Sequence, residues 1–168
     1  MTNSKPGRLI IVCGLPGSGK TTLAESLEAR LHAIRFSPDD WMDALGINLH
    51  DADKRARIEA LQWAFGQQLL KLGQIVIIEW GTWARSERDT LRFGARALGA
   101  SVELRFVSER PNVLIERIKH GARENPPITH DAISQWLASF QPPTEEELEL
   151  YDPPLAGDVD DDPGNAAL

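Results

Sequence analysis

The sequence predicts an α/β fold in which helices cover both faces of a short, mainly parallel β-sheet. Strand-sized apolar runs alternate with segments of helical periodicity, a pattern typical of parallel strands joined by crossover helices. A glycine-rich stretch, GLPGSGKT, joins the first apolar run to the first helical segment. The chain has 168 residues, of which 42% are hydrophobic, and this is enough for one sizeable core. We therefore expect a single domain over residues 1–151.

The first two strands of this sheet are expected within residues 8–36. An apolar strand over 8–13 precedes the glycine-rich stretch, and a helix over 20–31 follows it, with Leu23, Leu27 and Leu31 four residues apart on one face. A short second strand covers residues 33–36. Ser37 is a suitable N-cap for the next helix, because Pro38 fits a first helical turn and the acidic residues that follow favour the positive helix end.

The later elements continue the alternation. A helix over 51–72 ends at Gly73, and QIVIIE, residues 74–79, has the clearest pattern of a buried strand. A helix over 86–98 ends at Gly99, and a fourth strand covers 102–107. Further helices are expected from Pro111 to about residue 120, over 129–140 with Thr129 as its cap, and for one turn within 142–152. Residues 152–168 are acidic and rich in proline and glycine, so we expect a mobile tail there.

Charge and hydropathy limit the possible classes of function. The formal net charge is −7, from 25 acidic and 18 basic residues, and this argues against non-specific binding to long nucleic acid. No apolar run approaches the roughly 20 residues of a membrane-spanning helix, and the first residues lack the pattern of a secretory signal. A single cysteine, Cys13, suits a reducing compartment. We expect a cytoplasmic protein with no membrane partner.

Parallel strands bring their carboxyl ends to one edge of a sheet, where ligands bind in such folds. Three segments of this sequence directly follow the first three predicted strands: residues 14–21, 37–41 and 79–83. We therefore expect these segments to border one crevice.

The glycine-rich stretch matches the phosphate-binding pattern G-x-x-x-x-G-K-T. In this pattern glycines let backbone amides turn toward phosphate oxygens, the lysine reaches the outer phosphates and the threonine hydroxyl binds Mg²⁺. The preceding strand and following helix are the context that the motif requires. The residues expected to hold a nucleotide are Gly14, Leu15, Pro16, Gly17, Ser18, Gly19, Lys20, Thr21 and Thr22.

Motifs that the sequence lacks narrow the use of the bound phosphate. There is no N-K-x-D segment of a GTPase switch, no L-S-G-G-Q-like signature of a transporter ATPase, and no recognisable sensor region of a motor ATPase. A small kinase remains, and it needs an acceptor base, a metal and arginines that stabilise the transferred phosphate. A nucleotide-binding regulatory protein without catalysis is the alternative.

Four segments resemble the small bacterial P-loop kinases grouped with chloramphenicol phosphotransferase, zeta toxins and polynucleotide kinase modules, the AAA_33-like ATP-binding proteins. These segments are GLPGSGKTTLAESL, RFSPDDWMDALG, VIIEWGTWARSERD and ERIKHGAR, and the resemblance covers about residues 8–151. It implies a P-loop NTPase three-layer sandwich with a helical lid, and ATP and Mg²⁺ as cofactors.

The resemblance also implies roles for individual residues. It makes Asp39 the general base, although an acid there also suits a first helical turn. It makes Arg117 and Arg123 the lid arginines that contact phosphate, beside Lys20 in the loop. The third strand of these kinases commonly ends in aspartate, whereas here it ends in Glu79, which is expected either to contact the metal or to be a solvated strand end.

Five tryptophans give further candidates. Trp41, Trp80 and Trp83 fall on loops that border the predicted crevice, where they could form an aromatic wall for the acceptor, although core packing is the ordinary role of tryptophan. Trp63 and Trp136 lie at helical spacing and are expected in the core.

The class of acceptor follows from charge. Arg85 and Arg88 are three residues apart, share a helix face, and either hold an anionic acceptor or are ordinary surface charges. We expect a small-molecule hydroxyl, of an antibiotic or a metabolite, because the body of the chain is mildly acidic. The alternative acceptor is a 5′-hydroxyl polynucleotide end, which the basic residues between 85 and 123 could serve.

Overall fold

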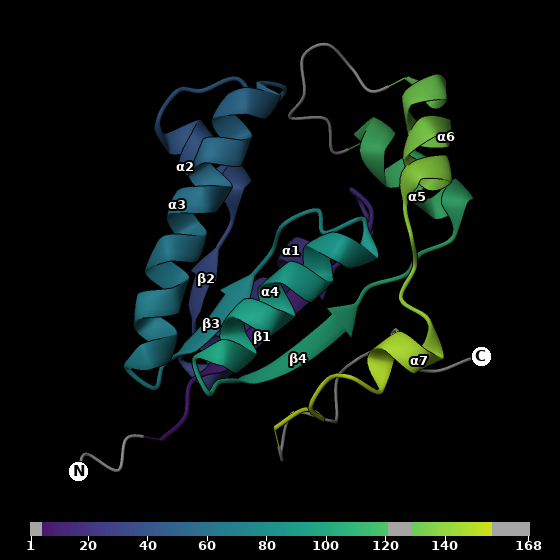
Figure 1. The fold of residues 1–168 in the computed structure, drawn as a ribbon. Helices are drawn as coiled ribbons and strands as arrows, with labels where there is room; N and C mark the ends of the chain where they lie inside the picture. The colour runs from purple at the N-terminus through teal and green to yellow at the C-terminus, as the bar shows by residue number, and fades with distance from the viewer. Residues whose placement is uncertain (1–4, 121–128, 156–168) are drawn as a thin grey trace.

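The computed structural model of the chain describes residues 5–120 and 129–155 (Figure 1). Within these residues, four parallel strands form one sheet in the order β2-β3-β1-β4. Helices lie on both faces of the sheet, which confirms the predicted fold class. The strands are β1 (Arg8–Cys13), β2 (Ile34–Phe36), β3 (Ile75–Ile78) and β4 (Ser101–Phe106).

The helices of the described residues begin and end close to their predicted positions. In Figure 1, α4 crosses one face of the sheet and α1 lies behind the other, while α5 and α6 stand beyond the carboxyl ends of the strands. The helices are α1 (Lys20–Leu31), α2 (Pro38–Ala44), α3 (Ala52–Lys71), α4 (Arg85–Ala97), α5 (Pro111–His120), α6 (His130–Ser139) and α7 (Glu145–Leu148).

Two apolar cores flank the sheet, because successive side chains of a strand point to opposite faces. On one face, Leu9 and Ile11 of β1 pack in a cluster with Leu70 of α3 and Leu91 of α4. On the other face, Ile10 and Val12 pack with Ala24 and Leu27 of α1. The resulting three layers fix the ends of β1 and β3 beside each other, and these two strands lead into the glycine-rich loop and into residues 79–83.

Several helix ends use the predicted caps. The Ser37 hydroxyl accepts a hydrogen bond from the Asp40 amide at 3.4 Å, and the Thr129 hydroxyl accepts one from the Ala132 amide at 3.2 Å. Gly73, with φ 77°, adopts the left-handed backbone conformation just after the last turn of α3. The capping signals in the sequence are therefore confirmed.

The predicted mobile tail begins too early. Asp152 pairs with β4 at the sheet edge: its amide donates to the Val102 carbonyl and its carboxylate accepts from the Val102 amide, both at 2.7 Å. Arg96 holds the same carboxylate at 2.7 Å, and Arg8 donates to the Pro153 carbonyl at 3.2 Å. These bonds cover part of an exposed edge strand although residues 152–155 form no strand. Residues 156–168 lie outside the described residues.

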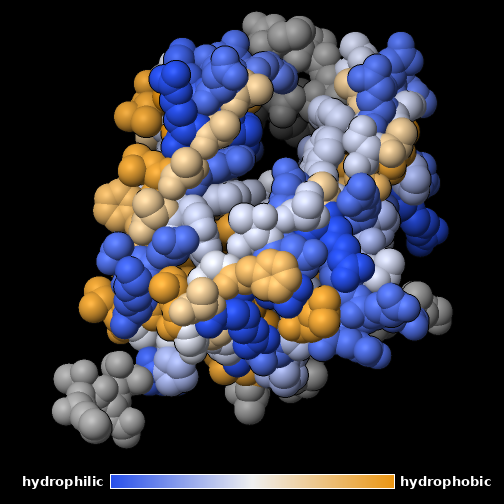
Figure 2. All heavy atoms as spheres, viewed as in Figure 1, coloured by the Kyte–Doolittle hydropathy of each residue, from blue (hydrophilic) through white to orange (hydrophobic). Residues whose placement is uncertain are grey.

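The space-filling view shows a hollow between the part of the molecule that carries α2 and α3 and the part that carries α5 and α6 (Figure 2). Across the described residues, no helix combines the length and the apolar character needed to cross a membrane.

Candidate active site

The glycine-rich loop leaves the first turn of α1 open for an anion. The backbone φ angles of Gly17 and Gly19 are 78° and 103°, which residues other than glycine rarely adopt. Gly19 is the N-cap of α1, so no side chain caps this helix and no acidic residue occupies its first turn. The amides at this end are therefore available to phosphate oxygens, which the helix dipole also attracts.

Lys20 lies at the same end of the hollow. Its ammonium donates to the Leu15 carbonyl at 3.0 Å, which holds it against the loop. Burial lowers the pKa of this ammonium from its usual value, and the nearby carboxylates of Glu79 and Asp39 partly oppose that shift. The Ser18 hydroxyl in the loop is buried and has no hydrogen-bond partner among the described residues.

Thr21 and Glu79 meet beside the loop, and Glu79 is buried, so it is not the solvated strand end considered as an alternative. The Thr21 hydroxyl donates to one carboxylate oxygen of Glu79, and Arg35 donates to the other at 2.8 Å. A hydroxyl and a carboxylate next to a phosphate-binding loop are the oxygen donors that Mg²⁺ prefers, so these residues fit that ion. Arg35 also pairs with Glu28 at 3.0 Å and Asp40 at 2.8 Å, a network that the sequence analysis missed.

Asp39 faces the same hollow from the start of α2. Its carboxylate is 61% exposed and accepts a hydrogen bond from the guanidinium of Arg55 on α3. Arg55 also donates to the Leu49 carbonyl at 3.4 Å. The arginine therefore fixes the orientation of the carboxylate, and no sequence motif had singled it out.

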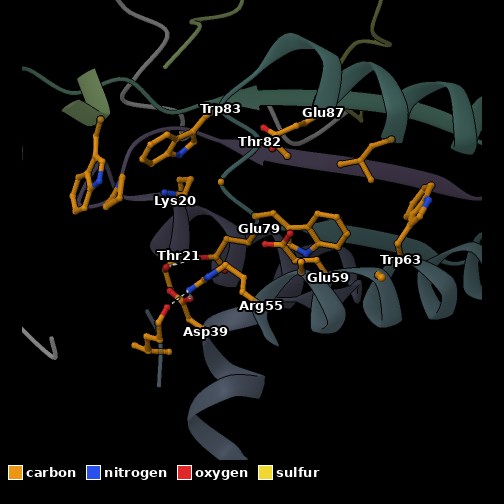
Figure 3. Close-up of a pocket in the computed structure, with 18 of the residues that line it drawn as sticks. Lys20, Thr21, Asp39, Arg55, Glu59, Trp63, Glu79, Thr82, Trp83 and Glu87 are labelled. Atoms are coloured by element: carbon orange, nitrogen blue, oxygen red, sulfur yellow. Dashed lines mark hydrogen bonds and ion pairs between the residues drawn. The ribbon is translucent and has the colours of Figure 1, made fainter. Parts of the chain in front are cut away.

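A single cavity of about 860 Å³ joins these groups to the space beyond them. Figure 3 shows Lys20 and Thr21 at one end and Trp63 at the other. All three segments predicted to border the crevice contribute to the lining. The residues that line it include Lys20, Thr21, Asp39, Arg55, Glu59, Trp63, Glu79, Trp80, Thr82, Trp83, Glu87 and Trp136.

Tryptophan side chains form much of the far wall, but not the set expected. Trp80 and Trp83 line the cavity as predicted, whereas Trp41 does not and instead packs edge-on against Phe36, with ring centroids 5.9 Å apart. Trp63 packs against the core as expected but also lines the cavity, whereas Trp136 lines the cavity and does not belong to either core cluster. The Trp63 indole packs against α4 at Gly94. A Cβ added at Gly94 would lie 2.7 Å from this indole, so glycine leaves the room that the ring needs.

Hydrogen bonds and ring contacts hold this wall in place. The Trp80 indole donates to Gln62 at 2.9 Å, and the fully buried Gln62 donates to the Ser37 carbonyl at 3.0 Å. Trp83 and Trp136 meet edge to face, with centroids 6.1 Å apart. The wall is thus connected to the residue that caps the helix of Asp39.

Arg88 has a role different from both expectations. Its side chain is fully buried, so it is neither a surface charge nor a ligand for an anionic acceptor. It pairs with Glu147 through two hydrogen bonds of 2.6 and 2.9 Å and donates to the Thr82 carbonyl at 2.9 Å. Arg88 therefore braces the loop that carries Trp80 and Trp83. Arg85 lies outside the cavity lining, with its guanidinium 3.7 Å from Asp89.

Of the two expected lid arginines, one lies within the described residues. Arg117 of α5 donates to the Gly17 carbonyl at 3.3 Å and pairs with Glu109 at 3.0 Å. It is therefore next to the loop, although it is not among the residues that line the cavity. Arg123 lies outside the described residues.

Residues 9–143 match the model of the AAA_33 family, which is described as an AAA domain. The chain belongs to the AAA_33 family. This confirms the resemblance to AAA_33-like P-loop proteins. The matched residues run from β1 to the segment before α7, so they include the loop, Asp39, Glu79 and Arg117.

Solved structures share the fold of this AAA_33 chain. A sugar kinase from Janibacter sp. HTCC2649 superposes with a TM-score of 0.61 at 23% identity, covering 84% of this chain and 82% of the kinase. The Pnkp1/Rnl/Hen1 RNA repair complex contains a chain with a TM-score of 0.65 at 21% identity, covering 90% of this chain and 48% of that one. The fold is that of P-loop kinases.

A short segment is also similar to a curated transporter. Over 57 residues the AAA_33 chain is 37% identical to the pleiotropic ABC efflux transporter of multiple drugs PDH1 of Candida glabrata, covering 34% of this chain. The chain spans about 4% of the length of the curated relatives that it matches.

Proposed function

We propose that this AAA_33 protein is a phosphotransferase that uses ATP and Mg²⁺ to phosphorylate a hydroxyl group of a small molecule, an antibiotic or a metabolite. One observation carries the proposal. The cavity that contains Lys20 and Thr21 also contains Asp39 and then continues into a tryptophan-lined space. A phosphotransferase needs such a second space for its acceptor, whereas hydrolysis needs only a water molecule at that position.

The loop end of the cavity would bind the nucleotide. The uncapped amides of α1 and the Lys20 ammonium hold the β- and γ-phosphates, because both present positive charge to them. Thr21 and Glu79 would hold Mg²⁺, and Arg35 keeps the Glu79 carboxylate in place. The metal, when bound, neutralises charge on the phosphate oxygens.

Asp39 would act on the acceptor. Its carboxylate takes the proton of the acceptor hydroxyl while that oxygen forms a bond to the γ-phosphorus, and the bond from this phosphorus to the β-γ bridging oxygen breaks, which releases ADP. Arg55 orients the carboxylate. Arg117, already beside Gly17, stabilises the transferred group together with Arg123.

A second candidate is a 5′-hydroxyl polynucleotide kinase. The likeness to a chain of the RNA repair complex, which has the higher of the two TM-scores given above, favours it. The carboxylates that line the far part of the cavity disfavour a phosphate-bearing acceptor, because their charge has the same sign. A regulatory protein that binds ATP without transferring phosphate remains the non-enzymatic alternative.

Transfer of labelled γ-phosphate separates these functions. The protein is incubated with labelled ATP, Mg²⁺ and, in separate reactions, small hydroxyl compounds or 5′-hydroxyl oligonucleotides. We expect label in a small compound and none after Lys20→Ala. Label only in oligonucleotides would favour the second candidate, and ATP binding without any labelled product would favour the regulatory one.

A further inference from the structure

The part of the cavity beyond Asp39 carries an excess of negative charge. Glu59 of α3 and Glu87 of α4 both line it. The guanidinium in this part belongs to Arg55 and is already paired with Asp39, while Lys20 lies at the loop end. Among the described residues, an acceptor bound here therefore meets carboxylates without matching cations.

Of these two carboxylates, Glu59 gives the stronger indication of a cationic ligand. Its side chain is half-buried, and among the described residues its carboxylate has neither a hydrogen bond nor an ion pair. Burial raises the pKa of Glu59, and the nearby positive charge of Arg55 only partly opposes this. A half-buried carboxylate without a partner is unfavourable in the free protein, and a cationic ligand would relieve that cost.

Glu87 offers a second free oxygen. One oxygen of its carboxylate accepts from the Ala84 amide at 2.9 Å and so caps the start of α4. The other has no partner among the described residues. Because the first bond fixes the carboxylate, the free oxygen is held at the cavity wall.

Thr82 is an independent sign of a ligand at the same wall. Its backbone has φ 41°, which is rare for a β-branched residue, and its side chain is 5% exposed. Thr82 is among the residues that line the cavity, and its buried hydroxyl has no hydrogen-bond partner among the described residues. Arg88 holds the Thr82 carbonyl at 2.9 Å and so maintains this conformation. A buried hydroxyl without a partner is rare in folded proteins, and a polar ligand group would satisfy it.

The tryptophans complete the recognition surface. Trp63, Trp80, Trp83 and Trp136 surround the same space, and aromatic faces bind both ring surfaces and cations. Figure 3 shows Glu59 on one side of the cavity, with Thr82 and Glu87 on the opposite side. The aromatic faces can pack against a ring, and the carboxylates can pair with amino groups that the ring carries.

We propose that the acceptor is a cationic ring compound that bears both hydroxyl and ammonium groups, of the amino-sugar or aminocyclitol class. This inference rests on the proposed phosphotransferase function. One ammonium group pairs with Glu59, a ring hydroxyl or amine bonds to Thr82, and the ring packs on the tryptophans. Anionic sugar acids are disfavoured, because they would place a carboxylate beside Glu59, where the described residues provide no free cation to compensate.

Acceptors that differ only in charge test the proposal. Transfer of labelled phosphate is measured with glucosamine and 2-deoxystreptamine, with their N-acetylated forms, and with glucose and gluconate. We expect kcat/KM for an amine to exceed that for its N-acetylated form by at least tenfold. A neutral or anionic compound as the best acceptor would overturn the proposal and leave the phosphotransferase function standing. ATP binding without transfer to any compound would overturn both.

Variants identify the residues responsible. Glu59→Gln should raise KM for the amine at least tenfold, leave KM for ATP unchanged, and have no effect with the N-acetylated form. Glu146→Gln, an exposed glutamate on α7, is the matched control and should change nothing. Thr82→Val should weaken amine binding, whereas Thr82→Ser should retain it. An equal loss in Glu59→Gln with the amine and with its neutral form would show that the charge is not recognised.

Discussion

Lys20 and the loop glycines depend on one another. The backbone turns that Gly17 and Gly19 permit expose the amides of α1, and Lys20 then adds a full positive charge at the loop end of the cavity. Removal of the ammonium takes away a positive charge that lies near the carboxylates of Glu79 and Asp39, so the incoming phosphates would meet a more negative site.

Lys20→Ala should therefore abolish binding of the triphosphate and transfer together. We expect ATP affinity to fall by at least tenfold, as measured by equilibrium dialysis, because the lysine interacts with the β- and γ-phosphates. AMP, which lacks those phosphates, should bind to the variant and to the wild type equally. An unchanged ATP affinity would show that the loop does not hold the phosphates as described.

Cys13 illustrates how deeply β1 is buried. Burial raises the pKa of its thiol to about 12, so the nucleophilic thiolate is scarce in the folded protein at neutral pH. Iodoacetamide at pH 8 should leave Cys13 unmodified until the protein is unfolded in urea, as measured by mass spectrometry.

The same shift predicts how stability depends on pH. The pKa of this thiol is higher in the folded state than the ordinary value of 9.0, so its contribution to the free energy of unfolding is complete below pH 9 and is lost as the pH rises toward 12. Rapid alkylation of the folded protein at pH 8 would contradict this account of Cys13.

The α4 helix and the short α7 helix act together through one buried pair. Arg88 and Glu147 bond to each other in a site closed to solvent, and Arg88 also holds the loop that carries Thr82 and Trp83. Removal of one partner leaves the other charge buried and unpaired, which typically costs about 3–5 kcal/mol.

Arg88→Ala should therefore lower the free energy of unfolding by about 3–5 kcal/mol. Arg85→Ala, in the exposed first turn of the same helix, should change it by less than about 0.5 kcal/mol. Urea unfolding followed by circular dichroism measures both. The double variant Arg88→Met, Glu147→Leu should recover much of the lost stability, and equal losses in the two single arginine variants would contradict a buried brace.

The molecule as a whole shows which features sequence patterns can predict. Helix and strand positions followed from local signals, such as the Ser37 cap and the glycine after α3, and the loop motif located the phosphate end of the cavity. These signals depend only on residues that are close together in the chain, so contacts between distant segments do not change what they predict.

Features that depend on contacts between distant segments were missed. Trp63 lines the cavity because Gly94 of α4 leaves room for its ring, and helical periodicity alone cannot distinguish a core face from a cavity wall. Arg88 is buried because Glu147, 59 residues later, neutralises it. Arg55 meets Asp39 because α3 packs on α2, and nothing in the local sequence around either residue indicates this pair.

The proposed function requires that one cavity combine a phosphate site with a carboxylate that activates an acceptor hydroxyl. It is tested most directly by Asp39→Asn, with ATP affinity and acceptor-dependent ADP release measured on the same protein, and with the exposed Asp43→Asn of the same helix as the control. We predict unchanged ATP affinity and a loss of ADP release of about 10²-fold or more, because the asparagine cannot take the proton. Release at the wild-type rate from Asp39→Asn would contradict the claim.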